Sequence, residues 1–180
     1  MTDMANRDRD WGWIRPLGCS IAAGMVLLPL IAMQFTAEVD WTLSDFLFAA
    51  VVIGAVGIAF EVAVRISANW SYRAGAAVGL GTAFLLTWSN AAVGYIGDDN
   101  PYNVVFVGVV LLAFIGALFA RFRAPGMALA MVGAGVAHGV AGGIGYPADP
   151  VTGPITIAFV AMWLTSAALF RKAAREDGQL

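Results

Sequence analysis

The sequence predicts an all-α integral membrane protein, a bundle of six transmembrane helices with its N-terminus and C-terminus in the cytoplasm. Of its 180 residues 60% are hydrophobic and only 12% are charged, and the mean hydropathy is +0.79. A soluble domain carries about 25% charged residues, and its core cannot hide so large an apolar surplus from water. Lipid is the solvent that fits this composition.

Six apolar stretches carry the prediction, because each is long enough to cross about 30 Å of hydrocarbon at 1.5 Å per residue. Short polar connectors separate them, and no soluble domain interrupts them. We therefore expect cytoplasmic tails at residues 1–16 and 171–180 around a transmembrane domain at 17–170. The stretches are Leu17–Phe35, Leu43–Val64, Ala74–Ile96, Pro101–Ala120, Pro125–Gly145 and Pro154–Phe170.

Local signals agree with the limits of these stretches. Thr42 and Asp45 have the spacing of a capping box, in which a carboxylate meets the free amides at a helix start. Pro29 lies inside the first stretch and is expected to kink it. Three further prolines stand at first helical positions, where the missing N–H costs nothing. They are Pro101, Pro125 and Pro154.

The basic residues predict the orientation. Lys and Arg gather on the cytoplasmic side of a bacterial inner membrane, and all ten fall on the same side of the six predicted spans. They are Arg7, Arg9, Arg15, Arg65, Arg73, Arg121, Arg123, Arg171, Lys172 and Arg175. The charged residues on the opposite side are all acidic. They are Glu38, Asp40, Asp45, Asp98, Asp99 and Asp149.

Glycine spacing predicts how the helices pack. Helices in lipid associate through close backbone approach, which small residues four positions apart permit. Gly75 and Gly79 have this spacing in the third span, and Gly135, Gly139 and Gly143 have it in the fifth. We therefore expect both spans to be interior helices, and the same glycines are also compatible with a path for a substrate or cofactor.

Polar residues inside the spans are the candidates for a binding site. Asn90 and His138 lie at similar depth in the third and fifth spans, so we expect them to face each other, with Thr87 and Ser89 extending the network. Glu61 is expected to pair with Arg65 on its own helix. Tyr95 and Tyr102 fit an aromatic belt at the membrane interface. The remaining binding candidates flank Asn90: they are Trp88, Asp98 and Asp99.

Motifs for catalysis are missing from the sequence. It has no glycine-rich phosphate loop, no zinc-binding histidine pair and no nucleophile–base arrangement, so we predict no catalytic residue and no metal site. The single Cys19 excludes an intramolecular disulfide. His138 alone cannot complete a metal site, and haem binding through His138 stays open only with a further ligand from elsewhere.

The polar end of the third span also carries a family resemblance. The run from Trp88 to Gly94, the acidic turn from Gly97 to Asn103 and the basic connector Ala120–Arg123 resemble a family of small uncharacterised bacterial inner-membrane proteins. The resemblance covers roughly the second to the fifth span. It implies a membrane location and carries no activity.

Three functions are compatible with these residues. The first is a non-catalytic accessory or assembly subunit, which has the lipid bilayer and another membrane subunit, or a second copy of itself, as partners and no nucleic acid. The second is a small uncoupled transporter or channel, in which Asp98 and Asp99 make the periplasmic mouth negative. The third is a cofactor-binding protein centred on His138.

Overall fold

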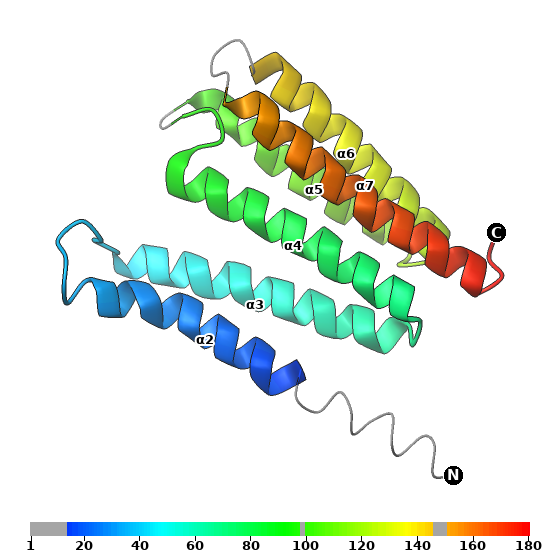
Figure 1. Ribbon diagram of the computed structural model, residues 1–180, viewed down its shortest axis with the longest axis horizontal. Coiled ribbons are helices and arrows are strands. Elements are labelled where there is room, and N and C mark those ends of the chain that lie inside the picture. The colour runs from blue at the N-terminus through cyan, green and yellow to red at the C-terminus, as the bar shows by residue number, and fades with distance from the viewer. Residues whose placement is uncertain (1–13, 98–99, 146–150) are drawn as a thin grey trace. The chain divides into compact units, whose positions relative to one another are not determined.

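The computed structural model describes residues 14–97, 100–145 and 151–180, and these residues form helices and no strand (Figure 1). The all-α fold predicted from the sequence is confirmed. Five helices, α3 to α7, are long and apolar enough to cross a membrane, when α5 is taken together with the 3-10 turn before it; the apolar part of α2, Gly18–Ala32, is shorter. The helices are α2 (Ile14–Ala32), α3 (Leu43–Ile66), α4 (Trp70–Val93), α5 (Val104–Phe119), α6 (Ala124–Gly145) and α7 (Thr152–Glu176), and the 3-10 turn η1 (Pro101–Asn103) precedes α5.

The helix limits follow the local capping chemistry. Asp45 accepts hydrogen bonds from both the backbone N and the Oγ1 of Thr42, each at 2.7 Å, so the expected capping box starts α3. Asn69 caps α4 by accepting a bond from the backbone N of Tyr72, and α4 therefore begins four residues before the predicted Ala74. At the other end of the chain α7 continues to Glu176, into the segment predicted as a tail.

The chain divides into two compact units, Met1–Gly57 and Ile58–Leu180, with the boundary inside α3. The first unit contains α2 and most of α3. In the second unit, α7 packs against both α6 and α4, and α5 packs against α6. The most apolar window of α6 is 44% buried against 22% for that of α4. The prediction of two interior helices therefore suits α6, whereas α4 is no more buried than α5.

The glycines of α4 and α6 make unequal contacts. A Cβ at Gly75 would lie 3.2 Å from the Phe170 ring, and one at Gly79 would lie 2.9 Å from Ser166 Oγ, so both glycines lie tightly against α7. Gly135 also lies close to α7, at the Cβ of Trp163 (3.3 Å). The other two predicted packing positions are looser. Gly139 leaves an ordinary contact at 3.6 Å, and Gly143 faces open space, which contradicts the expected contact there.

The closest approach of α6 to its neighbours is made by glycines outside the predicted series. A Cβ at Gly142 would overlap the side chain of Thr156, and one at Gly145 would overlap that of Ile96. Spacing by four residues places Gly143 beside Gly139, but the face of α6 that meets α7 continues instead through Gly142.

Three chain segments meet at one end of the second unit. The Tyr72 hydroxyl donates to the backbone O of Phe122 at 2.7 Å, which joins the start of α4 to the α5–α6 turn. Asn69 Nδ2 donates to Asp177 Oδ1 at 2.8 Å, which joins the same region to the end of α7. The basic residues of these segments therefore gather at one end. They are Arg65, Arg73, Arg121, Arg123, Arg171, Lys172 and Arg175.

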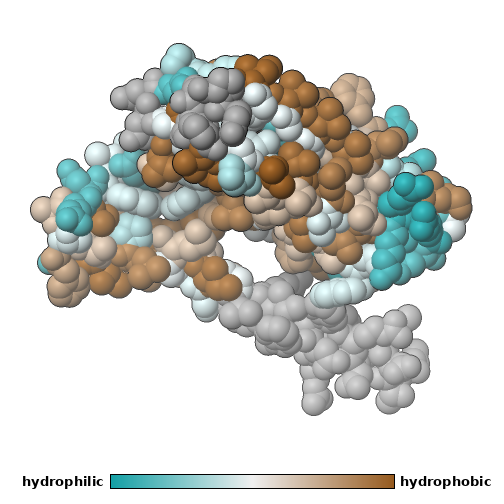
Figure 2. All heavy atoms as spheres, turned by 45° about the horizontal axis from the view of Figure 1, so that its top comes forward, coloured by the Kyte–Doolittle hydropathy of each residue, from teal (hydrophilic) through white to brown (hydrophobic). Residues whose placement is uncertain are grey.

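Large apolar side chains lie on the outer surfaces of the helices. Figure 2 shows hydrophobic residues spread over much of the visible face. Examples are Phe119 (86% exposed), Leu129 (74%) and Ile157 (72%). An apolar surface of this extent needs lipid or partner helices to cover it.

Candidate functional site

His138 is the centre of the main polar cluster in the protein interior. It lies past the middle of α6 and is fully buried, because it shares a helix face with the other residues of α6 that meet the core. That face has the three- and four-residue spacing of a buried helical stripe. Its members are Met127, Met131, Ala134, Gly135, His138, Ala141, Gly142 and Gly145.

The Tyr95 hydroxyl lies between two partners from different helices. It is 2.8 Å from Nε2 of His138 and 3.2 Å from Oγ1 of Thr156 on α7. A phenol has one proton, so Tyr95 donates to one partner and accepts from the other.

Aromatic rings enclose the imidazole. The ring of Phe159 stacks on His138 with centroids 5.3 Å apart and an interplanar angle of 19°, and Tyr95 meets the imidazole edge-on at 5.3 Å. Phe106 stacks on Tyr95 at 3.9 Å and lies 5.5 Å from His138. Nδ1 of His138 is buried and has no hydrogen bond within the described part of the chain. The imidazole is therefore surrounded by the protein's own side chains.

A fixed loop delivers Tyr95 to this position. Gly94 ends α4 with φ +66° and Gly97 has φ +72°, a backbone region that residues with a Cβ rarely adopt. Asn90 Oδ1 accepts a bond from Tyr95 N at 3.3 Å, and Asn90 Nδ2 donates to the backbone O of Asn103 at 3.2 Å. Oδ1 of Asn103 accepts from Ile96 N at 2.9 Å, and its Nδ2 donates to Gly97 O at 2.9 Å. These four bonds fold the 94–97 loop back onto the helices.

The predicted pairing of Asn90 with His138 is wrong. The side-chain amide of Asn90 bonds the backbone of the loop, and His138 bonds the Tyr95 hydroxyl. Asn90 and His138 are therefore connected only through Tyr95. The proposed extension of the network is also wrong, because the hydroxyls of Thr87 and Ser89 bond carbonyls of their own helix, Ala83 O and Leu85 O.

The remaining binding candidates are Trp88, on α4, and two aspartates. The Trp88 ring lies 5.4 Å from that of Phe84, one turn away on α4. Asp98 and Asp99 fall outside the residues that the structure describes. Glu61 forms the expected ion pair with Arg65, at 2.9 Å.

Tyr95 and Thr156 were missed by the sequence reasoning. The prediction that Tyr95 belongs to an aromatic belt at the interface is wrong, because its side chain is only 6% exposed. The signal that was available is the Gly94-Tyr95-Ile96-Gly97 run, in which two glycines flank a tyrosine and permit a loop that turns inward. Thr156 gave no signal beyond its place in an apolar helix.

The side chains that pack around His138 are those of Tyr95, Phe106 and Phe159. Among the described residues no group of three His, Cys, Asp or Glu side chains is placed to hold a metal. The Tyr95 hydroxyl links α6 and α7 to the α4–α5 loop through its contacts with His138 and Thr156.

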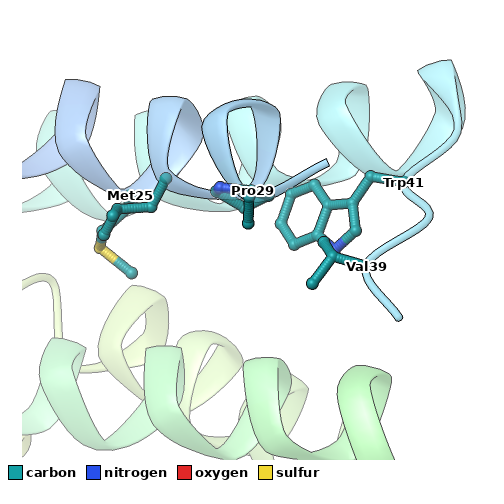
Figure 3. A pocket seen from close by; sticks show the side chains of 6 residues that line it. Met25, Pro29, Val39 and Trp41 are labelled. Atoms are coloured by element: carbon teal, nitrogen blue, oxygen red, sulfur yellow. The ribbon is translucent and has the colours of Figure 1, made fainter. Parts of the chain in front are cut away.

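A shallow groove lies in the first unit. Its volume is about 450 Å³, and Figure 3 shows four of the side chains that line it, Met25, Pro29, Val39 and Trp41. Leu28 and Ala32 complete the lining, which contains no acid, base or nucleophile. The groove is suited to apolar contact and offers no group for acid–base chemistry.

Comparison with known proteins adds no assignment to this geometry. No family model, curated protein or solved structure matches the chain.

Proposed function

We propose that this protein is a non-catalytic, multi-pass membrane protein that acts as an accessory or assembly subunit through the surfaces of its membrane-embedded helices. The observation that carries the proposal is the closed interior. His138 and Thr156, two of the polar side chains buried between α6 and α7, meet a tyrosine from the chain's own loop, and four hydrogen bonds fix that loop. The site is built to hold helices together.

The proposed location is a bacterial inner membrane, with α2 as a sixth crossing and both termini in the cytoplasm. Seven of the ten basic residues gather at one end of the second unit, which supports a single cytoplasmic face. The opposite end carries the end of α4 and the start of α5, and we assign this end to the periplasm.

The proposed contact surface for a partner is α3. Its most apolar window is 11% buried, the lowest value among the five membrane-length helices. Val51 is 68% exposed and Ile58 is 70% exposed on this helix. A partner helix of another subunit, or of a second copy, would cover such a surface through van der Waals packing.

Photo-crosslinking in native membranes tests this proposal. A photoreactive residue at Val51 or Ile58 is expected to give one discrete protein adduct, whereas the same residue at Ile157 of α7, equally exposed at 72%, is expected to give only lipid adducts. Identical products from α3 and α7 would count against the partner surface. Ion flux through the purified protein in liposomes would instead favour a channel, and a visible absorption band would favour a cofactor protein.

A further inference from the structure

The turn between α5 and α6 has an unusual backbone. Arg121 and Phe122 are consecutive and both have positive φ, +49° and +58°. Residues with a Cβ disfavour this left-handed region, and helix ends that need it normally use glycine. Here the turn is held by bonds from Arg121 N to Leu118 O (2.9 Å) and from Phe122 N to Ala117 O (3.2 Å), and by the Tyr72 hydroxyl on Phe122 O.

This turn presents two guanidinium groups without an acidic partner. Arg121 and Arg123 are both exposed, and neither forms an ion pair within the described residues. Other cations at this end are engaged. Arg65 pairs with Glu61, Lys172 pairs with Glu176 at 3.7 Å, and Arg73 donates to the carbonyls of Ser67 and Val64.

A large aromatic side chain precedes the two arginines in the sequence. Phe119 ends α5 and is 86% exposed, the highest exposure among the large hydrophobic residues that the structure describes. A phenylalanine at a helix end next to exposed arginines fits the boundary between hydrocarbon and head groups, where the ring lies toward the acyl chains and the cations lie toward phosphate.

We propose that the Phe119–Arg123 turn binds the head group of an anionic phospholipid, with Arg121 and Arg123 on the phosphate and Phe119 against the acyl chains. Guanidinium groups bind phosphate oxygens in a bidentate manner, and the left-handed backbone fixes where both arginines leave the chain. A glycine would suit the backbone at position 121 better, so the turn holds its arginine at a conformational cost that charge complementarity to the lipid explains. The proposal rests on the helices lying in a bilayer, as proposed above.

Lipid retention by the full chain tests the site. The purified protein is titrated with phosphatidylglycerol or phosphatidylcholine, and bound lipid is counted by native mass spectrometry. We expect the wild type to retain phosphatidylglycerol preferentially, and the Arg121→Gln/Arg123→Gln variant to lose about tenfold of that affinity. The Arg171→Gln/Arg175→Gln variant removes the same charge from the same end of the second unit and is expected to lose less than threefold. Equal losses in both variants, no lipid preference in the wild type, or displacement of the lipid by equimolar inorganic phosphate would each overturn the site.

A glycine substitution separates binding from folding. Arg121→Gly relieves the left-handed strain, so its melting temperature should equal or exceed that of the wild type while phosphatidylglycerol retention falls. A joint loss of stability and retention would show that Arg121 is a structural residue and would refute the proposal. Reconstitution provides a further distinction: a wild type that inserts into bilayers normally but shows no lipid preference refutes only this site, whereas a failure to insert refutes the proposed function as well.

Discussion

At the scale of single residues, the Tyr95 hydroxyl joins the buried polar side chains of α6 and α7. Tyr95 supplies the hydrogen-bond partner of His138 Nε2 and contacts Thr156, and all three side chains are less than 10% exposed. A buried polar group left without its partner costs about 1–3 kcal/mol, because its desolvation is no longer offset. Tyr95 is therefore the residue whose polar atom matters most to this cluster.

Tyr95→Phe tests that claim, because it removes the hydroxyl and retains the ring stacked on Phe106. We expect the free energy of unfolding to fall by about 1–3 kcal/mol, measured by thermal or denaturant unfolding in detergent. Tyr102→Phe is the matched control, since the Tyr102 hydroxyl makes only a long bond of 3.4 Å to Ala141 O. Its loss should stay below about 1 kcal/mol. Equal effects of the two substitutions would show that the Tyr95 hydroxyl has no special role.

The sequence identified His138 and Asn90 as the notable interior polar residues, but it did not identify their partners. A rise of 1.5 Å per residue along each helix places His138 and Asn90 at the same depth in the membrane. It does not predict the path of the loop between α4 and α5. That loop turns inward because Gly94 and Gly97 adopt positive φ, and such a path leaves no periodic pattern in the sequence.

At the scale of helices, the contact between α6 and α7 depends on where each glycine faces. Gly142 and Gly143 are neighbours in the sequence with opposite surroundings: a Cβ at Gly142 would overlap Thr156, and one at Gly143 would meet nothing within 4 Å. The helices approach most closely at Gly142, next to the Tyr95–Thr156 contact.

Alanine substitutions at the two positions should therefore differ in sign. Gly142→Ala is expected to destabilise the protein by about 1–3 kcal/mol through overpacking. Gly143→Ala should leave stability unchanged or raise it by up to about 1 kcal/mol, because alanine is the better helix former. Melting temperatures of the two purified variants provide the comparison. A stable Gly142→Ala variant would show that α6 and α7 lie farther apart than the structure places them.

The composition of the sequence predicts which segments form helices. It does not predict which side of each helix contacts its neighbours. The stretches beginning at Leu43 and Pro125 coincide with helix starts to within a residue, and Pro101 starts the 3-10 turn that precedes α5, because each has a proline or a capping pair at that point. The sides on which the helices meet depend on the rotation of each helix about its axis. A glycine series such as Gly135, Gly139 and Gly143 leaves that rotation undetermined, because glycines elsewhere on α6 are compatible with other contacts.

At the scale of the whole molecule, the distribution of charge determines the orientation that we propose. Single cysteines in a Cys19→Ser background report it. Cysteines at Glu38 and Val151 should react with a membrane-impermeant thiol reagent added to intact spheroplasts, and a cysteine at Arg123 should react only after lysis. All three positions are exposed, so failure to react reflects the side of the membrane. Labelling of Arg123→Cys in intact cells would reverse the assignment.

We propose that the protein works through its helix surfaces and carries no cofactor. Native mass spectrometry of the complex released directly from its own membranes in polymer nanodiscs measures both properties at once. We predict a mass equal to the 18.8 kDa chain plus a defined protein partner, or a defined multiple of the chain, with no additional cofactor mass. A lone chain, or a chain that carries the mass of a haem, would contradict it.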